Sequence, residues 1–285
     1  MIQDIYPSKL YNEFHKYEIS DNDYLLMFNE EGKILLGKKE NEVIFPCKAD
    51  MCHINDNNST ESNSDKESVV YLFSLDDKRF FLATSDMEIA KEDYSYYTMR
   101  EVRDVFSGKE VFAVFTAFHL WKWYRDNIYC GKCKGKLVFH DKERALVCPD
   151  CGNVIYPRIN PAVIVGVIKG DSLLITKYRR GYAHSALVAG FTEIGETLEE
   201  TVSREVMEET GVKIKNIRYY KSQPWGMAQD ILVGFYCETE EDSVIHMDEN
   251  ELKYAEWVKR EDIILQPNNL SLTNEMMRMF KENKI

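Results

Sequence analysis

Acidic side chains are crowded along one segment that the sequence predicts to be a helix. Thr197 and Glu200 form a capping-box pattern at its start, so we predict a helix over about 198–210. Glu205 and Glu209 lie four residues apart, at the edge of the apolar stripe of this helix. A glutamate-rich helix face usually points to solvent. Glu205 and Glu209, however, lie beside the apolar stripe, where two inward-facing carboxylates repel each other. A divalent cation resolves that repulsion, and such hard oxygen ligands suit Mg²⁺ or Mn²⁺, which can bridge phosphate oxygens and activate water.

Four cysteines form a second group with ligand chemistry. The pairs Cys130–Cys133 and Cys148–Cys151 are separated by 14 residues, a spacing typical of two knuckles that bind one tetrahedral Zn²⁺. Four thiolates leave no position for water, so this zinc is expected to be structural. A module of about 30 residues buries too little apolar surface to fold alone, and the metal would supply on the order of 10 kcal/mol. We therefore predict a zinc ribbon over 126–157.

A mixed β-sheet with helices is predicted to position the glutamates. Residues 158–285 contain several β-rich runs, one central helix and one C-terminal helix, so we expect an α+β domain. The expected strands cover 161–169, 172–177, 187–190, 217–221, 231–237 and 255–258, and the last helix covers about 272–283.

Residues 1–125 are also predicted to be mixed α+β, and no catalytic constellation is visible among them. We expect a supporting or dimerising domain there, with a polar loop or insertion at 55–68. The expected elements are a hairpin of strands 69–75 and 79–84, followed by helices at 95–106 and 109–125.

Composition and charge exclude several classes of protein. Of 285 residues, 44% are hydrophobic and 29% are charged, which excludes wholesale disorder. A net charge of −12 argues against a general binder of duplex DNA, because that affinity comes from Lys and Arg. No apolar run of about 18 residues and no secretory pattern are present, so we expect a cytoplasmic protein that does not span a membrane.

The glutamate segment resembles the signature of the Nudix hydrolases, Gly-x5-Glu-x7-Arg-Glu-U-x-Glu-Glu-x-Gly-U, where U is a bulky aliphatic residue. The fixed positions of the signature are occupied by Gly190, Glu196, Arg204, Glu205, Glu208, Glu209 and Gly211. This resemblance implies a mixed β-sheet sandwiched between helices. It also implies hydrolysis of a nucleoside diphosphate linked to another moiety.

Three further features are similar to the NADH pyrophosphatases, a Nudix family also described as NAD-capped RNA hydrolases. A zinc ribbon precedes the Nudix signature, the stretch 156–161 joins the two, and Ser222–Trp225 follows. The resemblance implies a degenerate Nudix-like domain at 1–125 and a catalytic domain at 158–285. It further implies a homodimer that hydrolyses NADH or NAD⁺ to NMN(H) and AMP, with NAD at the 5′ end of RNA as a further substrate.

The same resemblance implies roles for individual residues. Glu205, Glu209, Glu251 and the Ala189 carbonyl would bind the catalytic Mg²⁺ or Mn²⁺, and Glu208 would assist as a ligand or as the base. Flat rings that bind nicotinamide or adenine are expected at Tyr156, Phe191 and Trp225, although Tyr156 and Trp225 could instead be ordinary core aromatics. The other implied substrate contacts are Gln223, Pro224, Gly226, Met227, Ala228, Gln229, Asp230 and Thr273.

The sequence departs from the family pattern directly after Trp225. The family continues Pro-Phe-Pro-x-Ser, whereas this chain continues with Gly226 and runs to Asp230 without a proline. Other substrates, such as ADP-ribose, a diadenosine polyphosphate or a nucleotide sugar, therefore stay open. A non-catalytic module that binds RNA or a nucleotide through its ribbon is an alternative of another class. The ribbon region has a charge of only about +3, a weak electrostatic footprint for nucleic acid.

Overall fold

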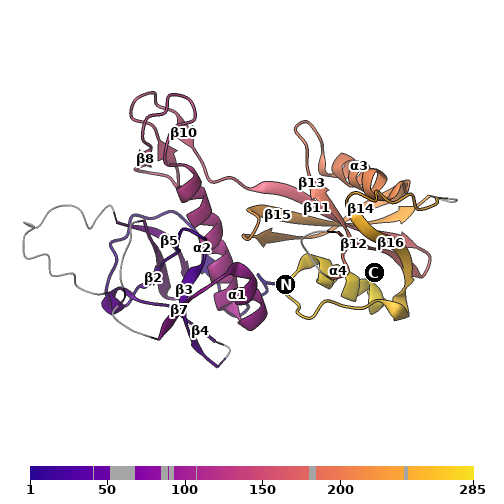
Figure 1. The fold of residues 1–285 in the computed structure, drawn as a ribbon, viewed down its shortest axis with the longest axis horizontal. Helices are drawn as coiled ribbons and strands as arrows, with labels where there is room; N and C mark the ends of the chain where they lie inside the picture. Colours follow the sequence, from indigo (N-terminus) through magenta and orange to yellow (C-terminus); the bar gives the residue numbers. More distant parts are fainter. Residues whose placement is uncertain are drawn as a thin grey trace, which may run out of the picture. The chain divides into compact units, whose positions relative to one another are not determined.

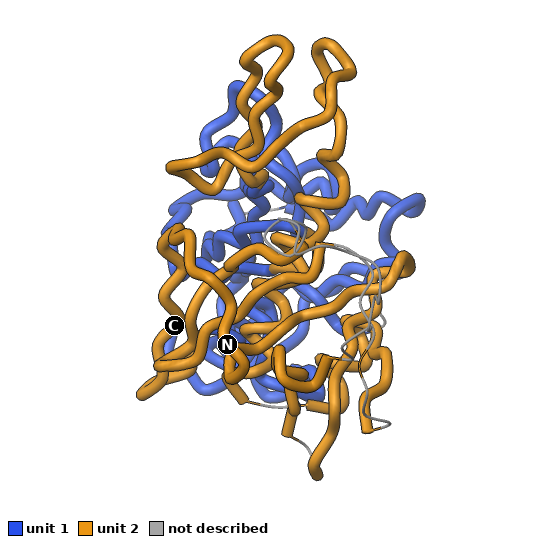
Figure 2. The backbone as a smooth tube through the Cα atoms, turned by 90° about the vertical axis from the view of Figure 1, so that its left-hand side faces the viewer, with its two compact units in different colours: residues 1–3, 159–225, 229–285 blue, residues 4–158, 226–228 orange. Residues whose placement is uncertain are grey.

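The computed structural model describes residues 1–40, 42–51, 68–84, 89, 93–106, 108–179, 184–240 and 243–285. The described chain divides into two compact units, drawn in blue and orange in Figure 2. Unit 1 consists of Met1–Gln3, Ile159–Trp225 and Gln229–Ile285, and unit 2 consists of Asp4–Arg158 and Gly226–Ala228. The loop predicted at 55–68 lies outside the described residues except for Ser68. None of the described helices combines the length and the apolar character that a membrane span requires.

Unit 1 is built on a six-stranded mixed sheet (Figure 1). Strand β11 is central: it pairs in parallel with β15 and antiparallel with β12 and β13. The strands are β11 (Asn160–Lys169), β12 (Ser172–Tyr178), β13 (Val188–Phe191), β14 (Ile214–Trp225), β15 (Asp230–Thr239) and β16 (Leu252–Lys259). Each strand predicted in this region is present, and the α+β prediction is confirmed.

Helices cover both faces of this sheet, α3 (Leu198–Thr210) on one and α4 (Leu272–Lys281) on the other (Figure 1). Alternate residues of a strand point to opposite faces, so β11 contributes to two cores. Val163 packs in the core beneath α3 with Val202 and Val206, and Ile164 packs in the core beneath α4 with Met276. A short 3-10 helix, Arg260–Asp262, follows β16.

The first three residues of the chain belong to unit 1. The backbone N–H of Ile2 donates to the Leu270 carbonyl at 2.9 Å, and the Gln3 amide donates to the Ser222 carbonyl at 3.1 Å. Ile2 is buried. These contacts tie Ile2 and Gln3 to residues more than 200 positions away, within the same unit.

The described part of unit 2 contains two small sheets, two α-helices, one 3-10 turn and the cysteine module. One sheet has the order β1-β5-β6-β2 and the other the order β4-β3-β7. Their strands are β1 (Leu10–Tyr11), β2 (Tyr24–Leu26), β3 (Ile34–Lys39), β4 (Glu42–Ile44), β5 (Val69–Leu75), β6 (Lys78–Ala83) and β7 (Tyr94–Tyr97). The helices are the 3-10 turn Lys48–Asp50, α1 (Met99–Val105) and α2 (Lys109–Asp126). The predicted hairpin of β5 and β6 is confirmed.

The helix predicted at 95–106 is wrong over its first residues. Tyr94–Tyr97 forms β7, which pairs antiparallel with β3, and α1 starts only at Met99. Thr98 is the reason: its hydroxyl accepts from the backbone N–H of Glu101, and the Glu101 carboxylate accepts from the Thr98 N–H at 2.8 Å. This capping box fixes the helix start, and the aromatic residues before it suit a strand.

Candidate active site

Helix α3 has the bounds that the sequence predicts. The Thr197 hydroxyl accepts from the N–H of Glu200 at 3.2 Å, and the Glu200 carboxylate accepts from the Thr197 N–H at 2.7 Å. Gly211 ends the helix in the left-handed conformation, with φ of 67°, where glycine carries no steric cost. These two signals place the glutamates of the last two turns next to strand β13.

Arg204 connects three carboxylates. Its Nε and Nη2 donate to both oxygens of Glu196 at 2.6 and 3.0 Å, and its Nη1 donates to Glu205 at 2.8 Å and to Glu208 at 3.0 Å. Nη2 also donates to the Phe191 carbonyl at 2.9 Å. The bond to Arg204 lowers the pKa of Glu196 to about 2. The Arg204 guanidinium therefore holds the loop before α3 in place and orients the side chains of Glu205 and Glu208 on the helix.

Glu205 lies directly over Gly190. A Cβ atom at Gly190 would overlap the Glu205 carboxylate, so only glycine allows this approach of helix to strand. Burial raises the pKa of Glu205, while its ion pair with Arg204 acts in the opposite direction. The Glu205 carboxylate is thus held beside the backbone of Ala189 and Gly190. This proximity is needed if a side chain of α3 and a carbonyl of β13 are to bind the same cation.

Glu209 is the most deeply buried acid of the site, with 3% of its surface exposed. The Tyr178 hydroxyl donates to Glu209 Oε1 at 2.9 Å and lies 3.2 Å from Oε2. Burial is the main cause that raises the pKa of Glu209 to about 8, and the charges of Glu205 and Glu251 act in the same direction. A buried carboxylate among other carboxylates is costly unless a cation joins it.

Glu251 directly precedes β16. The segment before it is attached to the end of α3, because the N–H groups of His246 and Asp248 donate to the carbonyls of Thr210 and Glu209 at 2.8 and 2.9 Å. The charge of Glu251 raises the pKa of both Glu205 and Glu209, so the three acids share one electrostatic site. Glu251 itself is exposed.

These residues fit a hard divalent cation by donor chemistry: three carboxylates and the Ala189 carbonyl offer only oxygen ligands. Their oxygens are less tightly gathered than the four thiols, which form the sole compact set of three or more Cys, His, Asp or Glu ligand atoms in the described parts of both units. Of the three carboxylates, Glu205 forms an ion pair with Arg204 at 2.8 Å.

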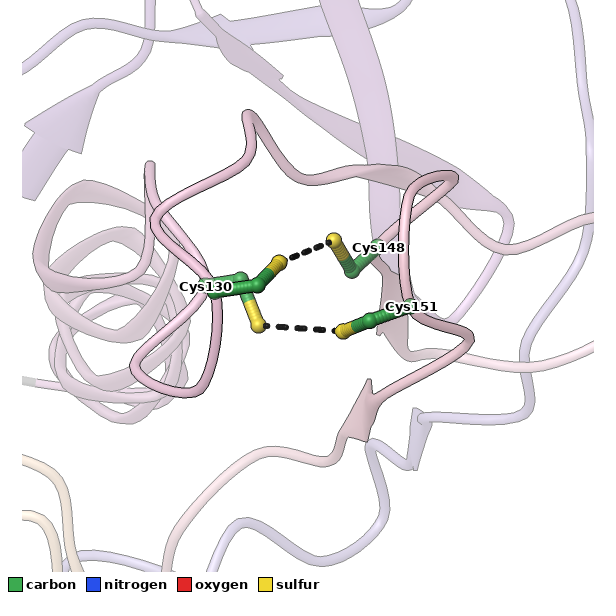
Figure 3. A group of neighbouring side chains, drawn as sticks. Cys130, Cys148 and Cys151 are labelled. Atoms are coloured by element: carbon green, nitrogen blue, oxygen red, sulfur yellow. Dashed lines mark hydrogen bonds between the residues drawn. The ribbon is translucent and has the colours of Figure 1, made fainter.

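The four predicted zinc ligands are gathered in unit 2. The sulfur atoms of Cys130, Cys133, Cys148 and Cys151 all lie within 4.8 Å of one another. Figure 3 shows the side chains of Cys130, Cys148 and Cys151 pointing toward one another. Cys133 Sγ is 3.3 Å from Cys148 Sγ, and Cys130 Sγ is 3.7 Å from Cys151 Sγ. Four convergent thiols match the tetrahedral coordination of structural Zn²⁺.

The backbone around the thiols has the form of two knuckles. The N–H groups of Cys133 and Lys132 lower the pKa of Cys130 to about 6, which favours the thiolate that a metal needs. Three short strands, β8 (Val138–Phe139), β9 (Leu146–Val147) and β10 (Val154–Ile155), form one antiparallel sheet. The first two lie between the knuckles, and β10 follows the second knuckle. Strands β8 and β9 form a hairpin between the two cysteine pairs.

The expected substrate residues of unit 1 have different environments. Phe191 is 53% exposed at the end of β13, and Thr273 is partly buried in the first turn of α4. Pro224 is exposed and Trp225 is partly buried at the end of β14, while Gln229 and Asp230 are buried at the start of β15. The remaining candidates belong to unit 2: Gly226, Met227, Ala228 and Tyr156, whose ring is 57% exposed and whose hydroxyl donates to Glu143 at 2.7 Å.

Gln223 is fully buried, and its amide is used within unit 1. Its Nε2 donates to Gln3 at 3.0 Å and to the Leu270 carbonyl at 2.8 Å, and its oxygen accepts from the N–H of Leu272 at 2.7 Å. These bonds fix the start of α4. In this structure the side chain supports the fold, and its predicted substrate contact stays a prediction.

Tyr178 is the residue of the site that the sequence did not indicate. Burial and the charge of Glu209 raise the pKa of its hydroxyl, so it remains a donor to that carboxylate. It lies outside the signature, in a strand assigned only by its apolar pattern. A tyrosine at the end of a core strand is weak evidence for a functional role. Only the register of β12 shows that this side chain points toward α3.

Comparison with known proteins agrees with this arrangement. The sequence model of the NUDIX domain family matches residues 158–280. A protein of Shigella flexneri named NAD-capped RNA hydrolase NudC is 42% identical over 151 residues, which cover 52% of this chain and 58% of that protein. A protein of the same name from Escherichia coli O1:K1 / APEC is 41% identical over the same shares.

The chain therefore spans less than two thirds of the length of these curated relatives. Among solved structures, a NUDIX hydrolase from Nitrosomonas europaea superposes with a TM-score of 0.48 at 20% identity, over 55% of this chain and 92% of that one. The family match over 158–280 coincides with the sheet, the signature helix and the acidic site described above. Residues 158–280 of this chain thus match the NUDIX domain family.

Proposed function

We propose that this chain hydrolyses the pyrophosphate bond of NADH or NAD⁺ with Mg²⁺ or Mn²⁺, giving NMN(H) and AMP. The observation that carries the proposal is the acidic site on α3, where the charge of Glu251 raises the pKa of Glu205 and Glu209 and where the Tyr178 hydroxyl joins Glu209 to Ala189. The name of the 41–42% identical relatives supports the choice of an NAD-containing substrate, including NAD at the 5′ end of RNA.

In this proposal the acidic residues serve either as metal ligands or as the proton acceptor. Glu205, Glu209, Glu251 and the Ala189 carbonyl would hold the divalent cation. When bound, the cation supplies charge compensation for the diphosphate and lowers the pKa of a coordinated water. Glu208 has 60% of its side chain exposed and is oriented by Arg204, so it can reach solvent and accept a proton from the attacking water. Water then adds to one phosphorus, and the bridging oxygen leaves with the other.

The proposed binding of the dinucleotide uses exposed rings and the strand ends. The ring faces of Phe191 and Tyr156 are accessible, each in its own unit, and could stack on nicotinamide or adenine. Pro224 to Asp230 and Thr273 remain candidate contacts by the family resemblance. We further propose a homodimer, a structural Zn²⁺ on the four cysteines and a cytoplasmic location, the last because CxxC thiols persist in a reducing compartment.

A substrate panel tests the proposal. NADH, ADP-ribose and a short RNA with a 5′ NAD would be supplied at equal concentration with Mg²⁺ or Mn²⁺. We expect NADH or NAD–RNA to be cleaved faster than ADP-ribose. Faster cleavage of ADP-ribose would favour the second candidate, a pyrophosphatase for another nucleoside diphosphate derivative. The departure at Gly226–Asp230 is the observation that keeps this candidate open.

The Glu209→Gln variant distinguishes the proposed hydrolase from a non-catalytic binding module. This change removes a charge without altering the shape of the side chain. We expect it to lower turnover by about 10²-fold or more while zinc content and fold are retained. A chain that binds NAD or RNA with no turnover, before and after the substitution, would establish the binding module instead.

A further inference from the structure

Tyr178 is the last residue of β12, and its side chain points toward α3. Leu174, four residues earlier and therefore on the same face of the strand, lies in the core beneath that helix. Tyr178 has no place in the family signature and touches none of the expected substrate residues through a described hydrogen bond. Its hydroxyl nevertheless ends among the residues proposed to hold the catalytic cation.

The hydroxyl joins two of those residues. It donates to Glu209 Oε1 at 2.9 Å, and it accepts from the backbone N–H of Ala189 at 3.1 Å. The Ala189 carbonyl is 3.3 Å away. A tyrosine hydroxyl has one proton, so its single donor is directed to the carboxylate and an acceptor lone pair to the strand. The distance between the Glu209 carboxylate on α3 and the Ala189 backbone on β13 is thereby set through one oxygen atom.

The backbone at the end of β12 also contacts Glu251, the third proposed carboxylate ligand. Tyr178 pairs with Leu252, and the N–H of Arg179 donates to the Glu251 carbonyl at 2.9 Å. The Arg179 side chain donates from Nε to the Leu252 carbonyl at 3.1 Å. The end of β12 therefore contacts Ala189 of β13, Glu209 of α3 and Glu251, which directly precedes β16.

We propose that Tyr178 is a positioning residue that presets the spacing of the Glu209 and Ala189 oxygens for the divalent cation. This inference rests on the proposed function of the acidic site. Groups that hydrogen bond a metal ligand orient it, and their loss typically weakens metal binding 10- to 100-fold. Tyr178 is well suited to this role, because its single proton occupies only one lone pair of Glu209. The other lone pairs of that carboxylate and those of the Ala189 carbonyl stay available to the cation.

The test is a Mn²⁺ titration of the full chain, with free Mn²⁺ measured by electron paramagnetic resonance and no substrate present. Tyr178→Phe removes only the hydroxyl. Tyr236→Phe is the matched control, since its hydroxyl donates to the Met276 carbonyl at 2.7 Å in the opposite core, beneath α4. Glu209→Gln identifies the site, because it should abolish the tight Mn²⁺ binding of the wild-type protein.

We expect Tyr178→Phe to weaken Mn²⁺ binding about tenfold or more, and Tyr236→Phe to leave it within about twofold of wild type. Hydrolysis by Tyr178→Phe should recover toward the wild-type kcat at saturating Mn²⁺. Unchanged or tighter Mn²⁺ binding in Tyr178→Phe, with only a lower unfolding temperature, would overturn the inference. If instead wild type and Glu209→Gln bind Mn²⁺ equally, the proposed function itself fails, whatever Tyr178 does.

Discussion

Arg204 and Glu196 form a two-point ion pair across eight residues of sequence, with Nε to Oε1 at 2.6 Å and Nη2 to Oε2 at 3.0 Å. Glu196 is also fixed by the N–H of Glu193 and the hydroxyl of Thr201. The pair therefore anchors the guanidinium from one side, and its remaining nitrogen is left for Glu205 and Glu208. The acidic residues of α3 are arranged by a cation of the protein before any metal ion binds.

Replacing Arg204 with lysine should disturb this arrangement while keeping the charge. A lysine ammonium cannot donate to both oxygens of Glu196 and to Glu205 in one plane. We expect Arg204→Lys to lower kcat about 10- to 100-fold, as loss of an orienting group does. Steady-state kinetics with NADH would measure this. Arg218→Lys, at an exposed position of β14, is the control; an equal loss in both variants would contradict a specific role for Arg204.

The pKa of Glu209 predicts how stability depends on pH without added divalent metal. Its folded pKa is about 8, against an ordinary value of 4.5. Between these values the folded protein holds a proton that the unfolded chain has lost, so stability falls as pH rises, by up to about 1.4 kcal/mol per pH unit. Urea unfolding of wild type and Glu209→Gln from pH 5.5 to 8 should show this slope only in wild type. Parallel curves would refute the assignment.

A methyl group at Gly190 should displace Glu205. The added Cβ would overlap that carboxylate, so the side chain must rotate away from the strand. We expect Gly190→Ala to weaken Mn²⁺ binding about tenfold or more, with α3 still formed, because its capping residues are untouched. Circular dichroism and Mn²⁺ titration of the same sample measure the two effects. Normal Mn²⁺ binding would show that Glu205 is not a required ligand at this position.

Loss of one thiol from the ribbon should release zinc. Cys148 is completely buried among the four sulfur atoms, and three thiolates bind Zn²⁺ less tightly than four. We expect Cys148→Ser to reduce zinc content measured after dialysis and to lower the unfolding temperature. Cys237→Ser is the control, since Cys237 is equally buried, but in the core of unit 1. Equal zinc loss from both variants would contradict the ribbon.

The elements with strong local signals could be predicted from the sequence. The bounds of α3 follow from Thr197 at one end and Gly211 at the other, and the four cysteines follow from their spacing. These signals act over a few residues and need no tertiary context. The strand Tyr94–Tyr97 shows the limit, because its pairing with β3 is decided by partners far away in sequence.

The parts of the site that depend on tertiary register could not be predicted. Gln223 was expected at the substrate, and the sequence alone could not show that Gln3, Leu270 and Leu272 take up its amide. Tyr178 was missed because its role depends on where β12 ends relative to Glu209. The domain boundaries at 125 and 157 and the Nudix-like character of residues 1–125 stay predictions.

The bond from Gln3 to Ser222 has a consequence for biosynthesis. The ribosome must add 219 further residues after Gln3 before its partner exists, and Leu270, which receives the N–H of Ile2, comes later still. Until then the apolar side chain of Ile2 has no core to enter. Unit 1 can thus take up residues 1–3 only after Leu270 has been synthesised.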